Sequence, residues 1–308
     1  MAEFKNNFSW SISRDSLFKE CKRKYYYNYY GSWGGWERDK ADKVTRILYV
    51  LKNLQNIRMW KGSLVHHEIE RVLKQLVTTG KLTPVDKSAE RVTELMRAGF
   101  RSSREGQYWD KQGSLRDETA LFEHEYKTGT PDGVWKKNYD DVILCLESFY
   151  NSSVLERIKE LPKEAVISIE SMTAASLSFT PEIVFVKLDL ALEKGEGIEV
   201  VDWKTGSGQS DKLQFLVYTL FANEEYELPP DQITVTEINL MSGDTINHNY
   251  DPEQLIEAED YIIKSIGKMK SLLQDPEENT AVMADFPRTD NDRICEYCSF
   301  KKICFDLD

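Results

Sequence analysis

The most constraining feature of this chain is a short segment rich in β-branched residues, 198–203, followed directly by Lys204. Glycines flank the segment, and this pattern predicts a β-strand that ends near Asp202 and Trp203. Because side chains alternate along a strand, Asp202 and Lys204 are expected on one face and Trp203 on the other. A carboxylate beside an ammonium can hold a divalent cation and orient a water molecule, whereas the plainer interpretation is a solvated ion pair.

A second strand is predicted at 183–193, joined to the first by a short glycine-containing turn. One face is expected to be apolar and to carry Val184, Val186, Leu188, Leu190 and Leu192. The other face carries Asp189, a carboxylate in an apolar hairpin that needs a partner when buried. A metal ion shared with Asp202 would supply that partner.

Helices are predicted on both sides of this hairpin. Downstream, 209–223 is expected to be a helix that places Gln214 and Tyr218 on one face. Upstream, the apolar periodicity of 41–78 predicts a helix that contains Gly62-x-x-x-His66. A single histidine on a helix is usually a core or surface residue, but beside two aspartates His66 is a suitable third metal ligand.

Four of the five cysteines form a pattern. Cys295, Cys298 and Cys304 give C-x2-C-x5-C near the C-terminus, and Cys21 lies near the N-terminus. Such clustering favours a metal or iron–sulfur site over disulfides, and spacing alone does not choose between zinc and iron–sulfur. Cys145 lies in an apolar helical stretch and is predicted to be a core residue.

Two basic segments are candidate nucleic-acid contacts. In a helix predicted at 9–30, Lys22 and Lys24 alternate with tyrosines that could stack on bases, or the tyrosines could pack inside and leave the lysines solvated. In 86–116, the basic residues Arg97, Arg101 and Arg104 fall with Tyr108 on one helical stripe. The alternative for this stripe is an exposed helix with no nucleic-acid role.

The bulk composition fits a globular protein of 308 residues, with 41% hydrophobic and 30% charged residues. The net charge of −12 argues against a broad nucleic-acid-binding surface, but a metal-dependent nuclease needs only a local basic track. The sequence shows no apolar run of membrane-spanning length and no apolar signal core, so we expect a cytoplasmic protein without a membrane contact.

The remaining pattern predicts an α/β protein. A helix is expected at 139–161, strands at 165–171 and 232–241, a helix at 251–273 and a linker at 276–290. We divide the chain into an N-terminal helix at 1–40, a helical region with the histidine motif at 41–164, a core at 165–274 and a cysteine tail at 275–308.

Taken in order, four motifs resemble the RecB-type branch of the PD-(D/E)XK nucleases: Gly62-x-x-x-His66, Asp189, Asp202-x-Lys204 and Gln214-x-x-x-Tyr218. The cysteine frame resembles the iron–sulfur members of that branch, among them the AddB nuclease domain and the CRISPR-associated Cas-four exonucleases. The resemblance covers about residues 10–305. The chain departs from these relatives at Val186-Lys187-Leu188, where they commonly have a glycine shortly before the aspartate.

This resemblance implies a restriction-endonuclease-like core, a mixed sheet flanked by helices, with a helical N-terminal insertion and an iron–sulfur C-terminal tail. It implies Mg²⁺ or Mn²⁺ held by His66, Asp189, Asp202 and the Trp203 carbonyl, with Lys204 as the catalytic lysine. Gln214 and Tyr218 would position the lysine or the DNA. A [4Fe-4S] cluster would bind the four cysteines of the frame: Cys21, Cys295, Cys298 and Cys304.

The leading hypothesis is therefore a metal-dependent DNA nuclease, an exonuclease on single-stranded ends, with a structural [4Fe-4S] cluster. One alternative is a non-catalytic DNA-end-binding subunit of a recombination or CRISPR adaptation complex, and helicase or adaptation proteins are candidate partners. Such subunits usually lose an aspartate or the lysine, whereas this chain has them all. Another alternative is a zinc-stapled protein of different function, which the wide separation of Cys21 from the other cysteines disfavours.

Overall fold

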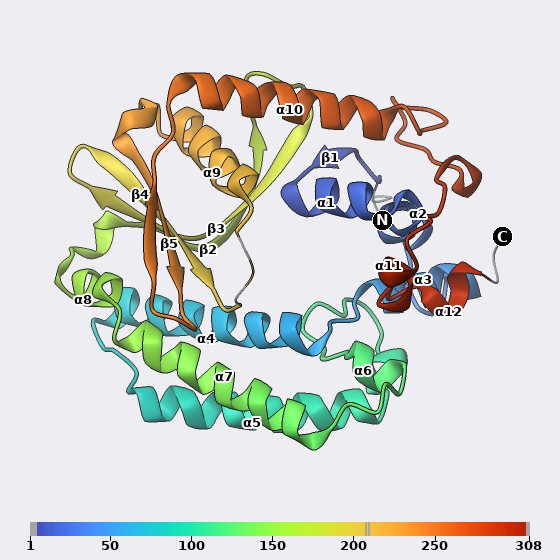
Figure 1. Cartoon of the computed structure of the whole chain (residues 1–308), viewed down its shortest axis with the longest axis horizontal. Helices are drawn as coiled ribbons and strands as arrows, with labels where there is room; N and C mark the ends of the chain where they lie inside the picture. The colour runs from blue at the N-terminus through green and yellow to red at the C-terminus, as the bar shows by residue number, and fades with distance from the viewer. Residues whose placement is uncertain (1–4, 207, 209, 306–308) are drawn as a thin grey trace.

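The predicted hairpin is present and lies at the centre of a mixed sheet (Figure 1). The computed structural model describes residues 5–206, 208 and 210–305. The hairpin consists of β3 (Ile183–Lys194) and β4 (Gly197–Lys204). The other strands are β1 (Ser9–Trp10), β2 (Val166–Ser176), β5 (Ile233–Asn239) and β6 (Thr245–His248). Their pairing order is β1-β3-β4-β5-β6, and β2 also pairs with β3 along most of its length.

On the side away from its turn, the hairpin opens into a fork, which begins at the pair Leu190↔Val201. The ladder joins β3 to β4 only from Leu190↔Val201 to Lys194↔Gly197, whereas β4 continues beside β5 in parallel as far as Lys204. The backbone N–H of Trp203 has left the β3 ladder and donates to Asp189 Oδ2 at 2.9 Å instead. The fork therefore leaves Asp189, Asp202 and Lys204 around an open space rather than in a closed sheet.

The side-chain alternation predicted for β3 is wrong beyond Leu188. Val184, Val186 and Leu188 pack in the core on one face of the sheet, but Leu190 and Leu192 pack in the core on the other face. The register places Glu170 of β2 opposite Asp189, and Glu170 has a left-handed φ of 47°. The change of faces in β3 coincides with this local irregularity, at the position where Asp189 enters the fork.

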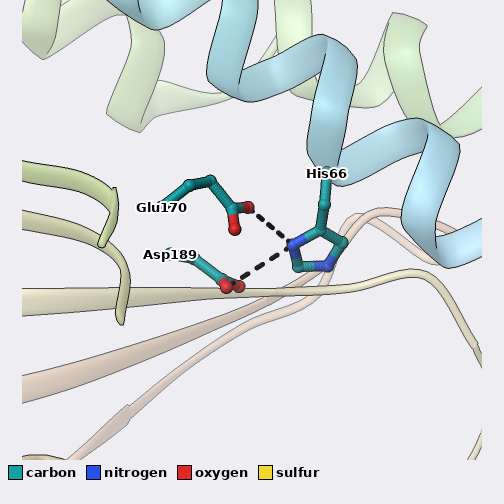
Figure 2. A group of neighbouring side chains, drawn as sticks. All are labelled: His66, Glu170 and Asp189. Atoms are coloured by element: carbon teal, nitrogen blue, oxygen red, sulfur yellow. Dashed lines mark hydrogen bonds and ion pairs between the residues drawn. The ribbon is translucent and has the colours of Figure 1, made fainter. Parts of the chain in front are cut away.

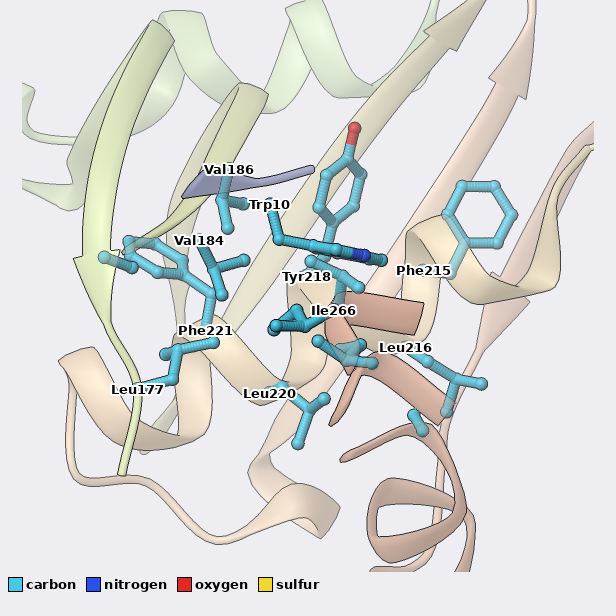
Figure 3. Close-up of a cluster of buried hydrophobic side chains, with 14 of the residues drawn as sticks. Trp10, Leu177, Val184, Val186, Phe215, Leu216, Tyr218, Leu220, Phe221 and Ile266 are labelled. Carbon is cyan, nitrogen blue, oxygen red and sulfur yellow. The ribbon is translucent and has the colours of Figure 1, made fainter. Parts of the chain in front are cut away.

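Two helices cover one face of the sheet, α9 (Lys212–Glu225) and α10 (Pro252–Lys270) (Figure 1). Figure 3 shows the core between them and the strands, where Trp10 of β1 packs among side chains of α9 and α10. Asp251 caps α10 with a reciprocal bond to Gln254, as expected for a helix that begins at Pro252. Helix α9 begins at Lys212 with Asp211 as its cap, and the predicted start at Gln209 lies outside the described residues.

Helices cover the other face in two layers, with α4 (Ile57–Thr79) nearest the strands (Figure 1). The others are α5 (Val85–Arg104), α7 (Asp132–Tyr150) and α8 (Ser153–Glu160). The predicted helix 41–78 is broken into α3 (Lys43–Lys52) and α4, because Asn56 caps the start of α4. The predicted helix 139–161 is likewise divided, with Ser152 capping α8.

The two ends of the described chain pack together beside α3 (Figure 1). The predicted helix 9–30 is instead β1, α1 (Ile12–Glu20), α2 (Lys22–Tyr26) and a wide turn, because Cys21 between the helices is extended at φ −162°. Helices α11 (Asp292–Glu296) and α12 (Lys301–Cys304) lie next to α2, and α6 (Phe122–Glu125) lies near them. Tyr25 and Tyr27 are fully buried, which excludes them from stacking on bases.

Within the described residues, we find no helix with the length and apolar character needed to cross a membrane.

Candidate active site and metal centre

A cavity of about 430 Å³ lies at the fork between β3 and β4. Six of the predicted site residues line it: His66, Asp189, Asp202, Trp203, Lys204 and Gln214. They come from α4, β3, β4 and the first turn of α9. The structure therefore brings together motifs that lie far apart in the sequence.

Lys204 is held by a network that starts on α9. Its Nζ lies 2.8 Å from Asp202 Oδ2 and donates to Gln214 Oε1 at 2.9 Å. Gln214 Nε2 and the Tyr218 hydroxyl both donate to Asp202 Oδ1, at 3.2 and 3.0 Å. Gln214 and Tyr218 thus fix the aspartate and the lysine, and Tyr218 is a positioning residue because it does not line the cavity.

His66 closes the opposite side of the cavity. Its Nδ1 lies 2.9 Å from Glu170 Oε1 and 3.4 Å from Asp189 Oδ1 (Figure 2). Its Nε2 lies 3.0 Å from the Trp203 carbonyl oxygen. Gly62 lies one helical turn before His66, and a Cβ there would come within 3.2 Å of the Thr205 hydroxyl, so a glycine lets α4 approach the end of β4.

Charge is crowded in this cavity. Burial raises the pKa of Asp202 to about 6, and the negative charge of Asp189 adds to that effect. Burial acts against the charged form of His66, but Asp189 and Glu170 outweigh it and raise the pKa of His66 to about 10. Burial would also raise the pKa of Asp189, yet the facing His66 lowers it. Asp189 and Asp202 repel each other, and a divalent cation between them would relieve that repulsion.

The donor set fits a hard divalent cation. Carboxylate oxygens, a carbonyl oxygen and an imidazole nitrogen are the ligands that Mg²⁺ and Mn²⁺ accept in proteins. His66, Glu170 and Asp189 each offer a ligand atom within 4.8 Å of the others. His66 must lose a proton to bind a metal, so we expect metal binding to release protons.

Glu170 is a site residue that the sequence interpretation missed. Its side chain is only 2% exposed and pairs with Lys187 as well as with His66. A usable signal was present, since Glu170 is the only charged residue in the predicted strand 165–171. A buried carboxylate of that kind needs a cationic or metal partner.

A family model described as the PD-(D/E)XK nuclease superfamily matches residues 9–305. The chain belongs to the PD-(D/E)XK nuclease superfamily. Membership indicates a metal-dependent nuclease, in agreement with the carboxylates and the lysine at the fork. No curated protein matches the sequence.

In this PD-(D/E)XK nuclease the four cysteines of the predicted frame line one small cavity: Cys21, Cys295, Cys298 and Cys304. Cys21 caps α2, and its sulfur accepts the Lys24 backbone N–H at 3.5 Å. Burial raises the pKa of Cys298 to about 11, while Lys24 and Arg288 line the same cavity. Cys145 lies apart in the core beside α4, as predicted.

The predicted nucleic-acid contacts lie away from the fork. Lys24 pairs with Glu20 at 3.0 Å at the cysteine cavity, and Lys22 is exposed on the same helix. Arg97, Arg101 and Arg104 are exposed on α5, beyond α4 and α7 as seen from the sheet (Figure 1).

The predicted stripe on α5 is wrong for Tyr108. This residue lies in a short turn after the helix, is 2% exposed and donates its hydroxyl proton to Glu125. Arg97 and Arg101 instead flank a groove with aromatic lining from Trp60, Phe100, Trp135 and Tyr139. Aromatic rings beside cations are typical of surfaces that bind single-stranded nucleic acid.

Proposed function

We propose that this PD-(D/E)XK nuclease hydrolyses phosphodiester bonds of DNA in a reaction that depends on Mg²⁺ or Mn²⁺, and that it acts as an exonuclease on single-stranded ends. The observation that carries the proposal is the convergence of Asp189, Asp202 and Lys204 in one cavity, with His66 opposite. A non-catalytic end-binding protein would not need this complete set.

Each side chain has a distinct role in this proposal. Asp189, Asp202, His66 Nε2 and the Trp203 carbonyl would hold the cation, which polarises the phosphate and lowers the pKa of a bound water. Lys204 orients the attacking water and balances the charge that builds on the phosphate, and Gln214 keeps its ammonium directed into the cavity. Glu170 lies against Nδ1 of His66 and would keep the proton on that nitrogen, so that Nε2, which faces the Trp203 carbonyl, would be the nitrogen that loses its proton and binds the metal.

The Glu170→Gln variant tests this positioning role. We expect Mn²⁺ affinity to fall about tenfold, because a carboxylate that holds the far nitrogen of a histidine ligand fixes its tautomer and basicity. Titration calorimetry with Mn²⁺ measures the change directly. Glu193→Gln, an exposed carboxylate at the end of β3, is the matched control. Equal affinities in the two variants would contradict the role given to Glu170.

We also propose that the cysteine cavity binds a [4Fe-4S] cluster. All four thiols of the frame line this one small cavity, and thiolates are the ligands of such clusters. Zinc, which thiolates also bind, is the competing metal. The cationic groups of Lys24 and Arg288 would offset the negative charge of such a cluster.

A digestion assay tests the function. The protein is purified without air and incubated with Mn²⁺ and either a 5′-labelled linear single strand or a circular single strand. We expect the linear strand to be shortened progressively and the circle to survive. Cutting of both would assign an endonuclease, and binding of ends without any cleavage would replace the proposal with a non-catalytic role.

The proposed DNA track makes a separate prediction. Arg97, Arg101 and Arg104, together with Lys22 and Lys24, would hold the phosphate backbone despite the net charge of −12. Replacing Arg97 and Arg101 by glutamate should weaken strand binding at low salt. The logarithm of the binding constant should also fall less steeply with the logarithm of the salt concentration, by about 0.7 for each phosphate that the variant no longer neutralises. Fluorescence anisotropy at several salt concentrations measures the slope. The control replaces Lys136 and Lys137, both exposed on α7, by glutamate. An unchanged slope in the arginine variant would mean that this face of α5 is solvated and does not bind the strand.

A further inference from the structure

A second cavity, of about 500 Å³, adjoins the candidate active site. It lies between the start of α9 and strands β5 and β6, and both cavities are lined by Gly208 and Ser210. The first turn of α9 separates them, because Gln214 faces the active-site cavity while Lys212 and Phe215 face the second one. A strand bound across the active site would pass Gly208 and Ser210 to reach this second cavity.

Three rings form one wall of this cavity, which we call the aromatic recess: Phe215, His248 and Tyr250. The centroids of Phe215 and His248 are 4.6 Å apart, and the rings of His248 and Tyr250 are nearly parallel, inclined by 6°, with centroids 6.4 Å apart. Phe215 and Tyr250 are 1% and 8% exposed, whereas the His248 side chain is 25% exposed. His248 is thus the ring that a flat ligand would contact, supported by two buried aromatic neighbours.

The polar groups of the recess favour a neutral, hydrogen-bonding ligand. Glu237 accepts a hydrogen bond from Ser210 and lies 3.1 Å from His248 Nε2, and its four lone-pair sites leave room for more donors. The Tyr250 hydroxyl is buried and has no hydrogen-bond partner among the described residues. Lys212 lies 5.9 Å from the centre of the Tyr250 ring and forms no ion pair within the described part of the chain.

We propose that the aromatic recess binds one nucleobase of the substrate strand, next to the phosphate at Asp202 and Lys204. The proposal rests on the proposed nuclease function, which it deepens by assigning a subsite. The carboxylate of Glu237 disfavours a phosphate inside the recess but accepts the N–H groups of a base, and Lys212 supplies a cation for the adjoining phosphate. Base stacking on aromatic side chains is tolerant of sequence, as a nuclease on single strands requires.

An abasic scan tests the subsite. Twelve-nucleotide single strands, each with one tetrahydrofuran abasic position, are bound to the metal-free protein, and affinities are measured by anisotropy. For wild type we expect one position at which loss of the base weakens binding about tenfold. His248→Ala should abolish that penalty, whereas His248→Phe should keep it because the ring face remains. His67→Ala, an exposed histidine on α4, is the matched control and should retain the penalty.

The outcomes separate the subsite from the function. A full abasic penalty in a folded His248→Ala variant, or no penalty at any position in a wild type that binds the strands, would overturn the assignment of the recess. Hydrolysis of bis(p-nitrophenyl) phosphate by wild type with Mn²⁺ reports the catalytic site separately, because this diester has no base. A wild type that neither binds strands nor hydrolyses this diester would overturn the proposed function and the subsite with it.

Discussion

The Lys204→Ala variant is expected to lose DNA cleavage by at least about 100-fold while it folds normally and still binds Mn²⁺. The ammonium of Lys204 lies 2.8 Å from Asp202 and 2.9 Å from Gln214, and in the proposed mechanism it would direct the water and balance the charge on the phosphate. Cleavage rates under saturating Mn²⁺ measure the loss, and calorimetry measures the retained metal binding.

The control for this prediction is Lys194→Ala, which removes a lysine at the far end of β3. Lys194 lies 4.0 Å from Glu199 and does not line the cavity, so cleavage should be unchanged. A folded Lys204→Ala protein that cleaves at the wild-type rate would remove Lys204 from the mechanism.

The second large effect is expected at the cysteine cavity. Cys298→Ser should abolish iron binding and destabilise the protein by about 3 kcal/mol or more, because the proposed cluster would join Cys21 to the C-terminal tail and close a loop of almost the whole chain. Iron content, visible absorption and the anaerobic unfolding transition report the change. The wild-type protein should be brown when purified without air and should lose colour on oxidation.

Cys145→Ser is the matched control for the cluster. Cys145 is fully buried in the core beside α4 and α7, so its replacement should cost packing energy without any loss of iron. A colourless anaerobic preparation with stoichiometric zinc and no iron would overturn the cluster assignment, though it would leave the nuclease reaction untouched.

The central hairpin and the residues around it could be predicted from the sequence because their signals are local. Alternation, glycine turns and the four-residue spacing of Gln214 and Tyr218 each depend on a few neighbouring residues. The capped helix α10 is predictable for the same reason, since Asp251-Pro252 is a strong start signal.

Features that depend on interactions between distant segments could not be predicted. The change of faces after Leu188 coincides with the left-handed backbone of Glu170 in the opposite strand, which no local pattern reveals. Strand β1 has only two residues and exists because it pairs with β3, and β6 has four. The break at Cys21 lies where α2 packs on the C-terminal tail, and there Arg23 donates to the Phe286 carbonyl.

We propose that a cation held at Asp189, Asp202 and His66 is what makes this protein a nuclease. One titration tests this proposal. Mn²⁺ is added stepwise to the protein in the presence of a labelled single strand. In the same samples, electron paramagnetic resonance measures the bound Mn²⁺, and the labelled strand reports the cleavage rate. We predict that cleavage rises in proportion to the occupied site, and that Asp202→Asn shifts both curves together to higher Mn²⁺. Cleavage at full rate with the site empty, or a filled site without cleavage, would contradict the account.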